Sequence, residues 1–450
     1  MKFSLPVFGS AAVYRALCAT AFLIALSGCD TFLGNKEDPP LPGTRIPILV
    51  EESSLSADSG SAGQELLLPP PTDNPTWPQA GGIASHAMHH IAVGGTLGPV
   101  WRASIGAGND DEERIMTQPV AAAGRVFTMD AETVVSAFDQ RNGKLLWRID
   151  LTPESEEDEG HIAGGIAYDS GRLYVTTGFA YVYALNAQSG RVQWHRDIGE
   201  PMRAPPTVRG NRVFVVTLTN KLFALNGFTG ETLWSHTAIE ETTGLLGGPA
   251  PAVDSGVVVA AFSSGELAAL RVENGRELWS DSLTTTRRAS SVATLAAIRG
   301  RPIIDRNIVI GISNSGLLAA IDLRTGRRIW DREIGGVESP WVAGDYIFLL
   351  SSNAELVAVG RRDGRIYWVR QLPLWEDPED RTGRLLWTGP ILISDRLIVA
   401  GSSGEALAVS PYTGEILGRE EMPDKVTIGP IAAGNTLYFL TEDGELVAYR

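Results

Sequence analysis

The chain has 450 residues and a formal net charge of −15, with 53 Asp and Glu against 38 Lys and Arg. An acidic chain without a dense Lys/Arg block argues against a groove that binds nucleic acid through its phosphates. The length allows a large buried core, and the composition is ordinary for a globular protein.

Residues 1–28 predict a signal peptide. They carry only two charges, and their apolar run over residues 16–26 is too short for a stable membrane span. The run ends in Leu-Ser-Gly-Cys29, which resembles a bacterial lipobox, so we expect Cys29 to become a lipidated N-terminus. The alternative is a signal peptide with a chance cysteine. Cys18 lies in the segment that would be removed, so the mature chain would have no disulfide.

Residues 29–75 predict a lipidated, disordered tether, because prolines and small residues interrupt any period of 2 or 3.6. Residues 76–100 predict a lead-in segment to the folded part. This segment contains His86, His89 and His90, which could bind a metal. No Cys or carboxylate lies close to them in the sequence, so we expect a surface or lead-in loop there and no metal site.

One motif recurs through residues 101–450, and residues 320–330 are its clearest copy. An Ala at the end of a strand is followed six residues later by a Gly, which supplies the positive φ of a tight turn. Asp322 and Thr325 can hydrogen-bond to the turn backbone. A Trp follows the Gly after four residues in six of seven copies, and Gly418 stands there in the seventh. The copies are Ala137/Gly143, Ala184/Gly190, Ala224/Gly230, Ala269/Gly275, Ala320/Gly326, Ala358/Gly364 and Ala408/Gly414, with a lone Ala448 after them.

The 350 residues of 101–450, divided among eight copies, give about 44 residues for each repeat. Each repeat shows four short β-branched or aromatic segments. No segment has a convincing helical period. These features predict an all-β protein, an eight-bladed β-propeller over residues 101–450. Residues 98–105 resemble the Trp strand of the first copy, whereas the eighth copy lacks one. We therefore expect the N-terminal strand to complete the last blade, which also removes an exposed sheet edge.

The motif resembles the tryptophan-docking repeat of the PQQ-like β-propellers over residues 101–450. That resemblance implies that each indole packs between adjacent blades and is a core residue, with no catalytic role. The blade-docking residues would be Trp101, Trp147, Trp194, Trp234, Trp279, Trp330 and Trp368.

Two branches of this family compete. One is the quinoprotein alcohol dehydrogenases, which bind PQQ and Ca²⁺ and use a vicinal disulfide that this chain cannot form. The other is the BamB family of the outer-membrane β-barrel assembly (BAM) machinery, which the lipobox, tether, repeat number and closing strand resemble more closely. We therefore expect a non-catalytic scaffold without cofactor or metal. The alternatives are a PQQ/Ca-dependent dehydrogenase or a propeller that binds envelope polymers.

The BamB resemblance implies a monomer within a hetero-complex, docked on the POTRA domains of BamA beside the other BAM subunits. It would help to deliver unfolded outer-membrane proteins. In the family this contact uses loops on one face of the middle blades. We expect Leu245, Leu246, Arg287, Arg288, Ile298 and Arg299, with Arg301 beside them, to form the partner-binding surface. Alternatively, the two leucines pack under their own loop. Residues 372–375 are a second candidate patch, and Trp341 and Trp387 fit either core or surface.

The resemblance also implies an outer-membrane lipoprotein that faces the periplasm. Asp30 opposes this localisation, because an Asp after the lipidated Cys resembles an inner-membrane retention signal. Two acidic runs, at residues 110–113 and 154–159, could bind Ca²⁺ loosely. Solvated loops are the better interpretation of both runs.

Overall fold

The computed structural model describes residues 55–61, 63–154, 164–241, 245–284 and 297–450. The predicted signal peptide, Cys29, Asp30, Arg287, Arg288 and most of the second acidic run lie outside these residues. The part described is all strand, turn and loop, without a helix, and therefore holds no helix that could cross a membrane. The all-β prediction is confirmed.

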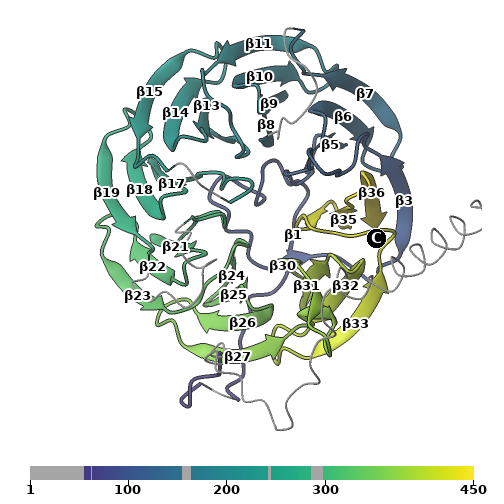
Figure 1. Ribbon diagram of the computed structural model, residues 1–450, viewed down its shortest axis with the longest axis vertical. Coiled ribbons are helices and arrows are strands. Elements are labelled where there is room, and N and C mark those ends of the chain that lie inside the picture. Colours follow the sequence, from purple (N-terminus) through teal and green to yellow (C-terminus); the bar gives the residue numbers. More distant parts are fainter. Residues whose placement is uncertain (1–54, 62, 155–163, 242–244, 285–296) are drawn as a thin grey trace, which may run out of the picture. The chain divides into compact units, whose positions relative to one another are not determined.

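The described residues form nine sheets, and eight of them lie around a ring with their first strands toward the centre (Figure 1). The first four sheets follow the chain. They are sheet 1 with β4 (Val120–Ala122), β5 (Arg125–Met129), β6 (Val134–Asp139) and β7 (Leu145–Asp150); sheet 2 with β8 (Gly165–Asp169), β9 (Arg172–Thr176), β10 (Tyr181–Asn186) and β11 (Val192–Asp197); sheet 3 with β12 (Thr207–Arg209), β13 (Arg212–Val216), β14 (Lys221–Asn226) and β15 (Thr232–Thr237); and sheet 4 with β16 (Ala252–Asp254), β17 (Val257–Ala261), β18 (Glu266–Arg271) and β19 (Glu277–Ser282).

The other four sheets repeat this order, and the last takes its outer strand from the start of the ring. They are sheet 5 with β20 (Ile303–Asp305), β21 (Ile308–Ile312), β22 (Leu318–Asp322) and β23 (Arg328–Arg332); sheet 6 with β24 (Trp341–Ala343), β25 (Tyr346–Leu350), β26 (Glu355–Gly360) and β27 (Ile366–Gln371); sheet 7 with β30 (Trp387–Ile393), β31 (Arg396–Gly401), β32 (Glu405–Val409) and β33 (Ile416–Glu421); and sheet 8 with β34 (Ile431–Ala433), β35 (Thr436–Leu440), β36 (Glu445–Tyr449) and β3 (Pro99–Ser104).

Sheet 8 confirms the predicted closure. Strand β3 pairs antiparallel with β36, and Trp101 stands opposite Ala448 in the register that Trp330 and Ala320 share. Backbone hydrogen bonds between Gly98 and Arg450, of 3.1 and 3.0 Å, extend the pairing to the last residue. The two ends of the ring therefore belong to one sheet, and no edge is left open between them.

The tryptophan docks join each sheet to the next. The motif glycines have φ between 69° and 73°, and a Cβ on any of them would lie 2.5–2.7 Å from the Trp of the preceding sheet. From Trp147 onward, the indole Nε1 also donates to a carbonyl in that same hairpin, as Trp279 does to Leu323 O at 2.7 Å. In the turn itself, Asp322 Oδ1 accepts the predicted bonds from Thr325 N and Oγ1, at 2.8 and 2.6 Å. The indoles therefore pack between adjacent sheets.

The departure of the motif at Gly418 now has a physical reason. Sheet 8 receives its outer strand from the N-terminal side, so it has no Ala–Gly hairpin on which an indole of sheet 7 could dock. Gly418 pairs with Ala408 in the usual register, but a Cβ on it would meet nothing within 4 Å. A hollow of about 230 Å³ lies beside it, with Leu97 and Tyr449 in its wall.

A central segment, residues 74–94, adds a feature that the sequence did not predict. It carries β2 (Ile91–Ala92), which joins the parallel strand β1 (Thr72–Asp73) to β30. We call residues 74–94 the hoop, because it passes the first strand of every sheet in turn and hydrogen-bonds to each sheet. The hydrogen-bonded pairs, in either direction, are Asn74 with Gly434, Trp77 with Ala121, Pro78 with Tyr168, Gln79 with Val208, Ala84 with Val253, Ser85 with Ile304, His89 with Trp341, Ile91 with Ser394 and Gly94 with Asn435.

The hoop satisfies backbone and side-chain groups that would otherwise face the centre of the ring. In Figure 1 this purple segment crosses the middle of the molecule. Trp77 is 1% exposed and stacks on Trp341, with ring centroids 6.2 Å apart. Trp341 and Trp387 are themselves buried, so both belong to the core.

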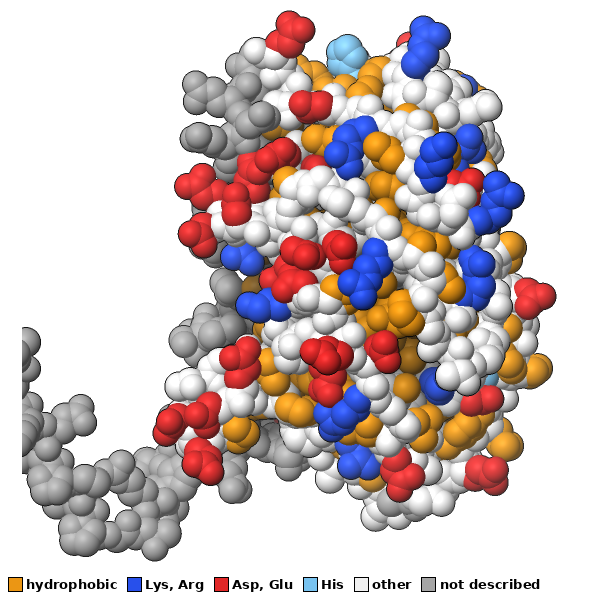
Figure 2. Space-filling view, turned by 90° about the vertical axis from the view of Figure 1, so that its right-hand side faces the viewer, with side chains coloured by type: hydrophobic (Ala, Val, Ile, Leu, Met, Phe, Trp, Pro, Cys, Tyr) orange, Lys and Arg blue, Asp and Glu red, His pale blue; other side chains and the backbone are white. Residues whose placement is uncertain are grey.

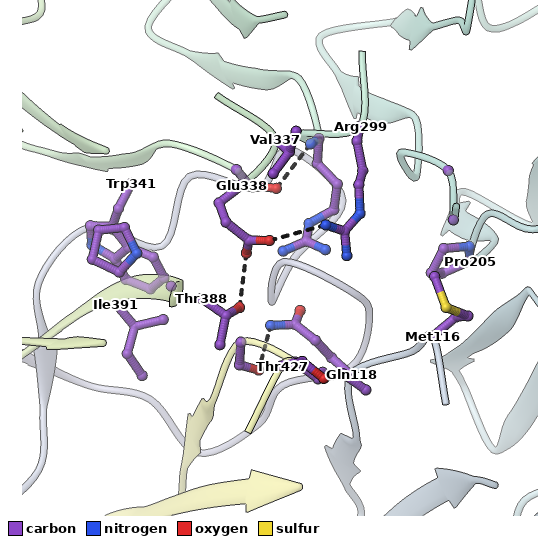
Figure 3. Close-up of a pocket in the computed structure, with 18 residues that line it drawn as sticks. Met116, Gln118, Pro205, Arg299, Val337, Glu338, Trp341, Thr388, Ile391 and Thr427 are labelled. Carbon is purple, nitrogen blue, oxygen red and sulfur yellow. Dashed lines mark hydrogen bonds and ion pairs between the residues drawn. The ribbon is translucent and has the colours of Figure 1, made fainter. Parts of the chain in front are cut away.

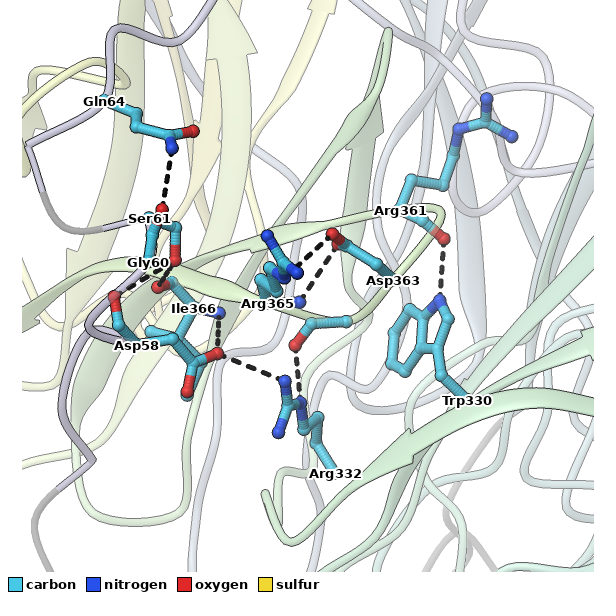
Figure 4. A network of polar contacts seen from close by, with 11 residues as sticks. Asp58, Gly60, Ser61, Gln64, Trp330, Arg332, Arg361, Asp363, Arg365 and Ile366 are labelled. Carbon is cyan, nitrogen blue, oxygen red and sulfur yellow. Dashed lines mark hydrogen bonds and ion pairs between the residues drawn. The ribbon is translucent and has the colours of Figure 1, made fainter.

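The tether predicted for residues 29–75 was too long. Residues 55–61 and 63–75 lie against the ring, where Leu66 is 2% exposed. Asp58 N donates to Ile366 O and Asp58 Oδ2 accepts from Ile366 N, both at 2.9 Å (Figure 4). The same carboxylate accepts from Arg332 at 3.1 Å. Composition predicted disorder here because it carries no information on contacts with residues about 300 positions away. Residues 29–54 of the predicted tether lie outside the described residues.

Candidate partner-binding site

The predicted partner residues that the structure describes meet on one face of the ring. Leu245 is half-buried and Leu246 is 43% exposed, in the loop that leads from β15 to β16. Ile298 is buried and Arg299 is half-buried, in the loop that leads from β19 to β20. Two loops from successive sheets therefore bring Leu245, Ile298 and Arg299 together around one hollow.

This hollow has a volume of about 430 Å³ and lies between sheets 3 and 4. Its floor is apolar where Phe262 is buried, and Leu218 at its edge is 42% exposed. Arg203, Glu241 and Arg299 add charge around it. We call the surface formed by Leu245, Leu246, Ile298 and Arg299 the partner face. We did not predict Arg203, Leu218 or Phe262 from the sequence, because no motif marks them.

The second candidate patch, residues 372–375, is divided by the fold. Leu372 is 1% exposed and belongs to the core. Trp375 is half-buried in a separate hairpin of β28 (Trp375–Asp377) and β29 (Thr382–Arg384). A contiguous apolar patch is therefore not formed by these four residues.

Beside the partner face lies a polar pocket at the centre of the ring, which we call the axial pocket (Figure 3). It shares Gly247, Gly248 and Arg299 with the hollow of the partner face. Arg299 Nη1 lies 3.5 Å from Glu338 Oε1, and Thr388 Oγ1 donates to Glu338 Oε2 at 2.9 Å. The loop before β4 contributes Gln118, which donates to Gly429 O at 2.8 Å.

The hoop contacts residues that line the axial pocket. Gly81 N donates to Gln118 Oε1 at 3.0 Å. Gly81 has a φ of +76°, and a Cβ there would lie 2.9 Å from the His86 ring and 3.0 Å from Arg301 Nε. Glycine is therefore required where the hoop passes the arginine. A cofactor on the axis of the ring would have to displace this segment.

The three histidines of the hoop contact separate partners and do not converge on a metal. His86 Nδ1 lies 2.7 Å from Pro302 O, and His90 Nδ1 lies 2.7 Å from Pro69 O. His89 Nε2 lies 3.3 Å from Asp305. His86 and His90 are buried, so of the two expected kinds of loop the surface loop does not describe them and the lead-in loop does. Among the described residues, no group of three or more His, Cys, Asp or Glu is arranged to hold a metal.

His86 predicts a loss of stability in acid. Burial, and then the positive charge of Arg301, lower its pKa from 6.5 to about 3. His86 therefore binds a proton below about pH 6.5 in the unfolded chain, but only below about pH 3 in the folded chain. Between pH 7 and 5 this linkage should cost about 2 kcal/mol of the free energy of unfolding.

The measurement is urea unfolding at pH 7 and pH 5 with wild type and His86→Asn. Asn tolerates the positive φ of 62° at this position. We expect the variant to lose less stability than wild type over this interval. An equal pH dependence in the two proteins would contradict the assignment.

Comparisons with known proteins agree on the fold and on a family. The family model for outer membrane protein assembly factor BamB matches residues 130–370. The outer membrane protein assembly factor BamB of Yersinia pestis is 27% identical over 355 residues, which cover 78% of this chain and 88% of that protein. The crystal structure of BamB from Moraxella catarrhalis superposes with a TM-score of 0.66 at 20% identity, over 79% of this chain and 100% of that one. A europium-containing methanol dehydrogenase superposes with a TM-score of 0.65 at 14% identity, over 83% of this chain and 89% of that one, and this likeness concerns the fold alone.

Proposed function

The chain belongs to the BamB family of outer membrane protein assembly factors, and we propose that it acts as a non-catalytic scaffold in that assembly. In this proposal the partner face docks on the POTRA domains of BamA, within a complex that includes the other BAM subunits. The observation that carries it is the grouping of Leu245, Ile298 and Arg299 around one hollow, next to the exposed Leu246. An apolar centre beside charged groups is typical of a protein-binding surface.

A scaffold role also fits the filled centre of the ring. The hoop occupies the axis with backbone and buried side chains, among them Trp77 and His86. We propose that this chain binds no PQQ there, although it shares its fold with a dehydrogenase. Addition of PQQ and Ca²⁺ to the purified protein should leave its absorption spectrum unchanged.

The rim of the ring is our proposed surface for unfolded clients. Each outer strand pairs with one strand of its sheet, so its other edge can accept an added strand, except where Asp58 already bonds to Ile366 at the start of β27. Outer strands also expose apolar side chains, such as Leu146, Leu233 and Leu417. Figure 2 views the rim from the side of β3, where hydrophobic side chains lie among charged ones.

We further propose that Cys29 is lipidated and holds the protein at the periplasmic face of the outer membrane. Residues 30–54 would then connect the anchor to the ring. Fractionation of the two membranes tests the proposal, because Asp30 would direct the protein to the inner membrane if it acts as a retention signal. Recovery only in the inner membrane would overturn the proposed localisation.

The docking proposal is tested by crosslinking in cells and purification through a C-terminal tag. We expect wild type to recover the POTRA-bearing barrel protein in stoichiometric amounts. Leu246→Asp should reduce this recovery by about tenfold or more, as expected for a residue that contributes about 1.4 kcal/mol or more to an interface.

The matched control is Phe228→Asp, since Phe228 is also exposed, 57%, but lies in the turn between β14 and β15, outside the partner face and the outer strands. It should leave recovery of the barrel protein unchanged. Equal recovery with Leu246→Asp would move the interface elsewhere. Absence of the barrel protein from the wild-type sample would reject the docking proposal.

A further inference from the structure

The first strands of the eight sheets share a pattern that makes two residues unusual. In six sheets a proline directly precedes the first strand, as Pro302 does in sheet 5, and in sheet 7 Pro390 lies within that strand. Of the eight residues at the position before this proline, or at its equivalent in sheet 2, six line the axial pocket. At this position the sheets carry Gln118, Gly165, Pro205, Ala250, Arg301, Ser339, Gly389 and Gly429.

Six of these eight residues are small or proline, and only Gln118 and Arg301 are long and polar. The side-chain amide of Gln118 is hydrogen-bonded on both sides: its oxygen accepts from Gly81 N and its nitrogen donates to Gly429 O. The Nε of Arg301, in contrast, is buried without a hydrogen-bond partner among the described residues. Arg301 as a whole is half-buried, and a buried guanidinium nitrogen without a partner is costly for the fold.

The charges around Arg301 do not balance. The charged side chains that line the axial pocket are Arg299, Arg301 and Glu338, which leaves one positive charge in excess. Glu338 is also engaged by Thr388. Burial and the neighbouring Arg299 lower the pKa of Arg301 to about 10, so it stays protonated at neutral pH. This local excess lies within a chain whose net charge is −15.

The pocket has the size and chemistry for one anionic group. Its volume is about 80 Å³, room for two or three waters at roughly 30 Å³ each, or for one carboxylate group. Guanidinium groups match the two oxygens of a carboxylate. The pocket also continues into the partner face through Gly247, Gly248 and Arg299, so a protein docked there reaches it directly.

We propose that the axial pocket receives an Asp or Glu side chain of the protein docked on the partner face, and that Arg301, with Arg299, binds its carboxylate. The inference rests on the proposed function and names the chemistry of the contact. Glu338 competes with the incoming carboxylate for the two arginines. Removal of Arg301 and removal of Glu338 must therefore have opposite effects.

The test uses purified full-length protein and the barrel protein that it co-purifies with. We expect Arg301→Met to weaken their affinity at least about tenfold, in the range for one partner of a buried charge pair. Glu338→Gln should tighten it. Arg276→Met, at an exposed position outside both surfaces, should leave it unchanged. If both pocket variants weaken binding alike, or neither changes it, the inference is overturned.

Binding of free acetate tests the carboxylate site without the partner protein. At constant ionic strength, replacing chloride with acetate should raise the melting temperature of wild type and not that of Arg301→Met. No shift in wild type would overturn carboxylate binding whether or not the barrel protein binds. A shift with acetate and with inorganic phosphate, combined with normal barrel-protein affinity in Arg301→Met, would identify a free-anion site and overturn the partner assignment.

Discussion

Trp279→Ala is expected to lower the free energy of unfolding by about 3–5 kcal/mol, the range for removal of a buried aromatic side chain. Trp279 is 8% exposed and packs on Gly326 of the next sheet. Its Nε1 bond to Leu323 O, 2.7 Å long, would be lost as well. The variant therefore opens the joint between sheets 4 and 5, and urea unfolding followed by tryptophan fluorescence measures the loss.

Trp375→Ala is the matched control. Trp375 is half-buried in the β28–β29 hairpin and takes part in no dock between sheets. We expect a loss of less than about 1 kcal/mol there, as for surface positions in general. Similar losses in the two variants would mean that the docks are not special joints of the ring.

The second large effect is expected from removal of the hoop. A chain that starts at residue 55 keeps every described contact, whereas one that starts at residue 97 loses Leu66, Trp77, Ile91 and Val93 from the core. At about 1.5–3 kcal/mol for each buried side chain, the loss is roughly 6–12 kcal/mol. This is comparable to the whole stability of a typical protein, about 5–15 kcal/mol.

Thermal unfolding followed by circular dichroism compares the two truncated chains. We expect a cooperative transition near that of the full chain for residues 55–450. For residues 97–450 we expect a transition at least 20 °C lower, or none. A cooperative transition within a few degrees of the full chain would show that the ring closes without the hoop.

Much of the ring could be predicted from the sequence because its joints are local. A hairpin with Gly at one position and Trp four residues later specifies its own turn, its strand register and the indole that packs on the next sheet, as residues 320–330 do. The repetition of that hairpin revealed the fold. The pairing of Trp101 with Ala448 was predictable because the eighth repeat lacks a Trp strand, whereas residues 98–105 form a Trp strand without a hairpin ahead of it.

The partner site was predictable only in part. Leu245 and Arg299 were chosen because the family resemblance implies a contact through loops of the middle blades, and the fold brings those two loops to one hollow. Arg203 and Phe262 were missed, since nothing in their local sequence separates them from neighbouring strand ends. Glu338 was missed because its importance depends on Arg299, 39 residues away.

By itself the sequence determined the sheets, their register and the order of the docks, since these depend on backbone turns and contacts that every repeat specifies again. The tertiary structure alone decided what lies at the centre. Residues 55–94 have no repeat and no regular period, so only the closed ring, with eight first strands facing inward, gives them a place to bind. The same closure turns Arg301, an ordinary arginine in the sequence, into an incompletely paired charge in a pocket.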